Sequence, residues 1–167
     1  MNYFLILFNF LEEGPEFRET FHGRSLYPGS TLNLKCSSRG TPLPQLRWYR
    51  YDVLLDHDPL SSIHHRIRDG GAGGASGYRI ADYVDEEGSI ISHLNVSSIA
   101  VEDGGLYSCE AVNEISTKKH TAMIQVFGPP MIHSMGNKSV VSSGKFQLDC
   151  PVSGFPIQEI HWKKGKD

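Results

Sequence analysis

The chain has 167 residues, of which 39 % are hydrophobic and 21 % charged, enough for one full domain and part of another. Its net charge of −3 and pI near 6.2 argue against a nucleic-acid-binding protein, which normally carries a basic face. We therefore expect no nucleic acid among its partners.

The N-terminal residues Tyr3 to Leu11 form an apolar run. The run is too short to span a bilayer, which needs about 20 residues. A signal-peptide core is the other interpretation, but no Lys or Arg precedes the run and no small-residue cleavage site follows it. We assign residues 1–13 as an N-terminal extension or a partial signal segment, and expect no direct membrane contact elsewhere in the chain.

Apolar and polar residues alternate from Leu32 to Cys36, which predicts a strand with one buried face. The preceding residues 28–30 (Pro-Gly-Ser) indicate a turn, and residues 14–26 would supply an edge strand before it. Leu46 and Trp48 predict the next strand, with both side chains directed inward.

Residues 56–77 break every periodicity and are rich in glycine. Such a composition does not stabilise a regular element, so this segment is expected to be a flexible loop inserted between two strands. Extended structure resumes at Arg79 to Val84, and residues 85–88 indicate a hairpin turn. Three further strands are expected to direct these residues into the core: Leu94, Val96, Ile99, Tyr107, Cys109, Ala111, Ala122, Ile124 and Val126.

One pattern, C-x(3)-G-x-P-x(5)-W, occurs twice, from Cys36 to Trp48 and from Cys150 to Trp162. Downstream of the first copy, residues 103–109 read D-x-G-x-Y-x-C. Cysteine, then tryptophan, then Tyr-x-Cys is the pattern of an immunoglobulin sandwich, in which the tryptophan packs on a disulfide and the tyrosine closes a corner. The predicted fold class is therefore all-β, with one complete immunoglobulin sandwich and the first strands of a second.

Three cysteines leave one without an obvious partner. The pattern pairs Cys36 with Cys109, whereas Cys150 is either a free thiol or a cysteine whose partner lies beyond residue 167. Disulfides persist in oxidising compartments, which indicates an extracellular location. The predicted core is centred on Leu34, Trp48, Leu94, Tyr107 and, in the second copy, Trp162.

The predicted domain boundaries follow from these elements. The complete domain spans residues 14–127, residues 128–130 form a short linker stiffened by proline, and residues 131–167 begin a second domain. In that second domain, residues 146–150 and 160–162 would be strands equivalent to those of Cys36 and Trp48. Fewer than about 40 residues seldom fold alone, so we expect this part to be poorly ordered in isolation.

Three segments carry a closer resemblance: residues 88–96 (GSIISHLNV), 103–107 (DGGLY) and 150–157 (CPVSGFPI). They are similar to the I-set immunoglobulin domains of the Down syndrome cell adhesion molecule (Dscam) family, over about residues 14–167. The resemblance implies an I-set β-sandwich from a single-pass cell-surface receptor. It also implies a protein partner, an identical copy of the same isoform.

In that family the homophilic surface lies on the sheet built from strands A, B, E and D. Carried over to this sequence, the resemblance implies the outward residues Asn33, Lys35, Arg79 and His93 as candidates. The family usually has an arginine before the tyrosine that opens strand D, poised to pair with the aspartate of D-x-G-x-Y-x-C. Gly77 stands at that position here, so Arg79 would reach Asp103 only through a change of register.

Two N-x-S sequons predict N-glycosylation, at Asn95 and Asn137. Asn95 is expected to point outward, because its neighbours Leu94 and Val96 point into the core. A glycan at Asn95 would therefore decorate the same sheet that the resemblance assigns to self-recognition.

Chemical signals are weak, and we predict no enzyme, no cofactor and no metal. The loop residues Asp56 to His65 hold histidines and aspartates but match no metal motif, and glycine-rich surroundings do not preorganise zinc ligands. Two other functions stay open on the same fold: a heterophilic or immune-type receptor fragment, and a structural spacer in a longer immunoglobulin array.

Overall fold

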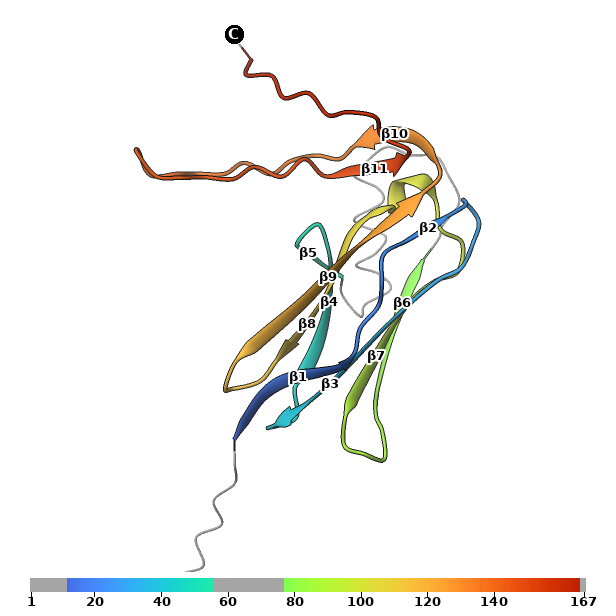
Figure 1. Cartoon of the computed structure of the whole chain (residues 1–167), viewed down its shortest axis with the longest axis vertical. Helices are drawn as coiled ribbons and strands as arrows, with labels where there is room; N and C mark the ends of the chain where they lie inside the picture. Colours follow the sequence, from blue (N-terminus) through green and yellow to red (C-terminus); the bar gives the residue numbers. More distant parts are fainter. Residues whose placement is uncertain (1–11, 56–76, 166–167) are drawn as a thin grey trace, which may run out of the picture.

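The computed structural model describes residues 12–55 and 77–165. Within these ranges the chain forms two facing β-sheets, followed by a thin segment that continues beyond one end of the sandwich (Figure 1). The apolar N-terminal run and almost all of the glycine-rich segment lie outside the described residues.

The first sheet contains β1 (Glu13–Glu19), β3 (Leu32–Thr41), β7 (Ile90–Val96) and β6 (Tyr78–Val84). These strands pair in the order β1-β3-β7-β6, and every pair is antiparallel. This sheet corresponds to the one that the family resemblance implies for strands A, B, E and D, which are β1, β3, β7 and β6 here.

The second sheet has the order β2-β9-β8-β4-β5. Its strands are β2 (Arg24–Leu26), β9 (Thr117–Val126), β8 (Gly105–Val112), β4 (Gln45–Arg50) and β5 (Val53–Leu55). All pairs are antiparallel except β2, which runs parallel to β9. The segment expected as one edge strand is therefore divided, because β1 joins the first sheet and β2 the second.

Two turns outside the sheets confirm local predictions. Residues 85–88 connect β6 to β7, and one Asp85 carboxylate oxygen accepts hydrogen bonds from the Glu87 and Ser89 amides at 3.0 and 2.8 Å. The 3-10 helix η1 (Val101–Asp103) leads into β8, where the Tyr107 hydroxyl donates to the Asp103 carbonyl at 2.8 Å. This last bond is the tyrosine corner of an immunoglobulin sandwich.

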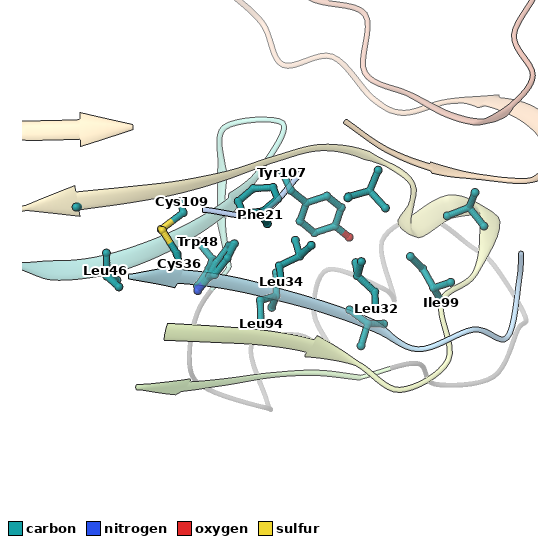
Figure 2. Close-up of a cluster of buried hydrophobic side chains, with 14 residues drawn as sticks. Phe21, Leu32, Leu34, Cys36, Leu46, Trp48, Leu94, Ile99, Tyr107 and Cys109 are labelled. Atoms are coloured by element: carbon teal, nitrogen blue, oxygen red, sulfur yellow. A yellow bond between two sulfur atoms is a disulfide. The ribbon is translucent and has the colours of Figure 1, made fainter. Parts of the chain in front are cut away.

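The core lies between the two sheets, and Figure 2 shows the Cys36–Cys109 disulfide beside Trp48, toward one end of a cluster that extends to Ile99. Trp48 is 1 % exposed, and its indole N–H donates to the Ser92 hydroxyl at 2.8 Å. Ser92 in turn donates to the Asp82 carboxylate, so the buried indole nitrogen has a partner. The disulfide and the predicted core positions in the first copy are confirmed: Leu34, Trp48, Leu94 and Tyr107 are all buried.

The second unit differs from its prediction. β10 (Gly128–Ile132) and β11 (Val152–Phe155) form a separate two-stranded antiparallel sheet, and residues 128–130, expected as a linker, lie inside β10. Residues 133–151 run outward and return (Figure 1), and the predicted strand at 146–150 does not form. The strand expected at 160–162 is also absent from the structure.

The prediction that Trp162 belongs to a core is wrong, since its exposed fraction is 53 %. Phe146 and Leu148, which lie in the segment expected to form a strand at residues 146–150, are 62 % and 43 % exposed. The physical reason is that no described strand faces them across a sandwich, so these apolar side chains have no second layer to pack against.

Candidate binding face

The outer face of the β1-β3-β7-β6 sheet carries all four residues that the sequence places in a binding surface. Successive side chains of a strand alternate between faces. Because Leu34 and Leu94 enter the core, Asn33 and Lys35 on β3 and His93 on β7 face outward.

Strand register orders these residues in rows across the sheet. Asn33 pairs with Asn95, which pairs with Arg79 on β6, so these three side chains lie side by side. The next row joins Lys35 and His93. The structure therefore brings the four candidates together on one surface, over three adjacent strands.

An ion pair joins the outer face to the edge strand. The Lys35 ammonium lies 2.6 Å from a Glu19 carboxylate oxygen, and both side chains are exposed. The hydrogen bond with Glu19 raises the pKa of Lys35, so the ammonium is charged at neutral pH. An exposed pair of this kind contributes little to stability, but it leaves both signs of charge at neighbouring positions.

An aromatic pair lies beside this ion pair. The Tyr83 ring stacks on the His93 ring with centroids 6.0 Å apart and an interplanar angle of 10°. Tyr83 is 50 % exposed, whereas its pairing partner Ile91 is 7 % exposed. The face thus combines an accessible aromatic side chain with charged and amide groups.

The two sequons occupy different environments. Asn95 lies in the middle of the face, half-buried between Asn33 and Arg79, and Asn137 lies exposed in the outgoing segment after β10. The outward position predicted for Asn95 agrees with its register. Glycosylation at either site remains a prediction.

The change of register that would bring Arg79 to Asp103 does not occur, because Arg79 pairs with Asn95 and faces outward on the first sheet. Instead, Arg50 at the end of β4 places a guanidinium nitrogen 3.5 Å from an Asp103 carboxylate oxygen, in a partly buried pair. Sequence reasoning missed Arg50. Its position two residues after Trp48, on the same side of the strand, is a signal that could have found it.

Other chemistry finds little support in the described residues. Among residues 12–55 and 77–165, no group of three or more His, Cys, Asp or Glu side chains could hold a metal ion. The histidine-containing loop considered for zinc lies outside these ranges. No helix in the same ranges is long and apolar enough to cross a membrane.

Comparison with known proteins assigns the fold. Residues 15–113 match the model of an immunoglobulin domain. The chain is 37 % identical over 146 residues to "Cell adhesion molecule Dscam2" of Drosophila melanogaster, covering 87 % of this chain and 6 % of that protein. It is 34 % identical over 155 residues to "Cell adhesion molecule DSCAM" of Rattus norvegicus, covering 92 % of this chain and 7 % of that protein.

Solved structures of immunoglobulin domains superpose on this chain. A crystal structure of the N-terminal eight Ig domains of Down Syndrome Cell Adhesion Molecule superposes with a TM-score of 0.71 at 28 % identity, covering 86 % of this chain and 16 % of that chain. A titin Z1Z2 chimera, at 20 % identity and a TM-score of 0.54, covers 71 % of this chain and 99 % of that one, and shows the fold alone.

The chain spans less than a tenth of the curated relatives it matches, so it corresponds to a small part of proteins of that size. The matched domain is a non-enzymatic fold, in agreement with the prediction that the chain is not an enzyme. The resemblance to the Dscam family and the predicted immunoglobulin β-sandwich are both confirmed. The chain belongs to the immunoglobulin-domain family.

Proposed function

We propose that this chain is an extracellular adhesion module that binds an identical copy of itself through the outer face of the β1-β3-β7-β6 sheet. The observation that carries the proposal is the gathering of Asn33, Lys35, Arg79 and His93 on one face, next to the exposed Tyr83. The curated relatives are named cell adhesion molecules, which supports the same reading.

A symmetric contact suits this face. In a two-fold dimer the same patch serves both copies, so a self-binding patch must be complementary to itself. The face carries positive charge at Lys35 and Arg79 and negative charge at Glu19 and in the turn at residues 85–87. A two-fold axis can therefore place opposite charges against each other, and such complementarity governs specificity and association rate.

The disulfide supports an extracellular location, because such bonds persist in oxidising compartments. The relatives are named cell adhesion molecules, and by analogy we place the parent protein at the cell surface as a single-pass receptor. A glycan at Asn137 is compatible with this proposal, whereas a glycan at Asn95 would lie within the proposed binding face.

Sedimentation of charge variants tests self-binding. The unmodified chain is expected to dimerise, whereas Lys35→Glu and Glu19→Lys each weaken dimerisation by about tenfold, the effect of roughly 1.4 kcal/mol. An equimolar mixture of the two variants should associate better than either alone, because one face then carries more negative charge and the other more positive charge. Lys119→Glu, which breaks a similar ion pair with Asp52 on the other sheet, is the control and should dimerise normally.

Monomeric behaviour of the unmodified chain at millimolar concentration would remove the support for self-adhesion by this unit. Dimerisation that only Lys119→Glu weakens would move the contact to the opposite sheet.

A heterophilic receptor is the second candidate, and Asn95 is the observation that favours it. A glycan in the middle of the proposed face would obstruct a sheet-to-sheet contact. Intact mass before and after glycosidase treatment measures occupancy. If dimers form only after glycosidase treatment, the glycosylated protein is expected to bind a different partner through another surface. Cell-aggregation assays that compare cells carrying the same isoform with cells carrying different isoforms would detect such binding.

A further inference from the structure

Tyr51 contacts the segment that follows the first domain. Its hydroxyl donates a hydrogen bond to the Val152 carbonyl oxygen and accepts one from the Val152 amide nitrogen at 3.1 Å. Val152 opens β11, which pairs with β10 along one edge only. A single hydroxyl, with one donor and two acceptor lone pairs, thus satisfies both backbone groups of Val152 that the two-stranded sheet leaves unpaired.

The backbone at Tyr51 is unusual. Tyr51 and Asp52 have φ angles of 49° and 61° and form the two-residue turn that joins β4 to β5. Two-residue hairpin turns with a positive φ at both positions prefer asparagine and glycine. A bulky residue at positive φ is an outlier. Non-glycine residues held at positive φ cluster at functional sites, where contacts with the surrounding structure offset the free-energy cost of the strained backbone.

The surroundings of Tyr51 hold its ring in place. A Cβ atom added to Gly105 would lie within 2.4 Å of the Tyr51 ring, and Gly105 itself has a φ of 146°, so only glycine fits there. The centroid of the Tyr51 ring lies 6.2 Å from that of the His133 ring, and His133 hydrogen-bonds the buried Ser153 hydroxyl at 3.0 Å. Burial raises the pKa of the Tyr51 phenol, which keeps the hydroxyl protonated and able to donate.

Apolar contacts also cross the junction. The rings of Phe127 and Phe155 lie 5.2 Å apart, and Gly128 approaches Val101 so closely that a Cβ would meet a Val101 methyl at 2.4 Å. Contacts of this kind hold two surfaces together but are not directional. Hydrogen bonds are directional, and those at Tyr51 specify one residue of β11.

We propose that Tyr51 is a positioning residue for the following unit, and that its hydroxyl fixes the β10–β11 segment in one orientation on the first domain. The binding face of the first domain and the next unit then keep a constant angle. This inference is independent of whether the first domain binds a copy of itself.

The test compares Tyr51→Phe with Tyr49→Phe in the full 167-residue chain. Tyr49 loses the same atom, but its hydroxyl bonds Glu110 on the exposed face of the second sheet, away from β11. In Tyr51→Phe, exchange of the Val152 amide is expected to accelerate by about tenfold, and Tyr49→Phe should leave that rate unchanged. Residual dipolar couplings should fit one alignment tensor for the first domain (residues 14–55 and 77–127) and residues 128–155 together in the control, and two tensors in Tyr51→Phe.

Amide exchange at Leu34 and Cys109 reports on the first domain and should be unchanged in both variants. A Tyr51→Phe chain that keeps a single alignment tensor and a slow Val152 amide would overturn the proposal. Loss of protection at Leu34 and Cys109 would also overturn it, because Tyr51 would then stabilise the domain rather than position its neighbour.

Discussion

The two copies of the Cys–Trp pattern adopt different environments in the same chain. In the first copy, Trp48 is 1 % exposed beside the Cys36–Cys109 disulfide. In the second, Trp162 is 53 % exposed and Cys150 is a free thiol. The spacing of the two copies is the same, so the spacing does not by itself bury the indole.

The difference lies in what faces each copy. β8, the neighbour of Trp48 in its own sheet, brings Cys109 to Cys36 of the facing sheet, and β7 in that facing sheet supplies Ser92 for the indole N–H. No described strand performs either role for the second copy. Burial of the tryptophan therefore depends on a second β-sheet that packs against it, and the residues of that sheet lie outside the Cys–Trp motif.

The largest expected effect comes from the disulfide. Replacing Cys36 and Cys109 by alanine removes a bridge that closes 73 residues, and should lower the free energy of unfolding by about 4 kcal/mol in the chain-entropy model. Cys150→Ala, the control, should change it by less than about 0.5 kcal/mol. Urea denaturation monitored by Trp48 fluorescence in a Trp162→Phe background measures both changes in the free energy of unfolding. Equal losses of stability in the two variants would show that Cys150 contributes to the core as much as the disulfide does.

High pH should destabilise the first domain through Tyr107. Burial raises the pKa of Tyr107 to about 12, above its unfolded value of about 10. The folded state then binds more protons than the unfolded state between these values, so stability is constant below about pH 9 and falls as pH rises from 10 to 12, by up to about 3 kcal/mol.

Urea titrations from pH 8 to 11.5 measure that slope. Tyr49 and Tyr51, whose pKa values burial also raises, act in the same direction, so the difference from Tyr107→Phe isolates the Tyr107 contribution. The second unit holds no tyrosine. An unchanged slope in Tyr107→Phe would show that Tyr107 is not the group responsible.

A matched tryptophan pair addresses the comparison directly. Trp48→Phe should cost about 2 kcal/mol, because it leaves a gap in the core and removes the donor to Ser92. Trp162→Phe should stay within about 0.5 kcal/mol. Comparable losses in thermal or urea unfolding would mean that both indoles are buried.

The smallest expected effect concerns the position two residues after each tryptophan. Arg50→Met removes the partly exposed ion pair with Asp103, and should cost about 1 kcal/mol once solvent screening is allowed for. Lys164→Met, at the same position of the second copy, is exposed and should have no measurable effect. Equal unfolding midpoints for both variants would show that the Asp103 pair adds nothing.

Much of the first domain could be predicted from local pattern. The alternation from Leu32 to Cys36 predicted which side chains enter the core, and the same alternation placed Asn33 and Lys35 on the outer face. The ion pair of Lys35 with Glu19 and the stacking of Tyr83 on His93 could not be predicted, because they depend on which strands become neighbours and in what register.

The junction shows the same limit more clearly. Tyr51 carries no sequence motif, and its contact residue Val152 is 101 positions away. The sequence predicted a linker at residues 128–130 from its prolines, whereas these residues form β10 because β11 returns to pair with them. The sequence shows which side chains can form hydrogen bonds, but it does not show which distant residues they contact.

The amino-acid sequence alone determined the immunoglobulin sandwich, the Cys36–Cys109 pairing and the core positions of the first domain, since a repeating two-residue period and a fixed Cys–Trp–Tyr order specify which face each residue occupies. Only the tertiary structure decided that Arg50 and not Arg79 pairs with Asp103, that Trp162 lies in solvent, and that Tyr51 meets Val152. Those outcomes depend on contacts between distant segments, and the distance between two side chains in space is a property of the assembled sheets rather than of either segment.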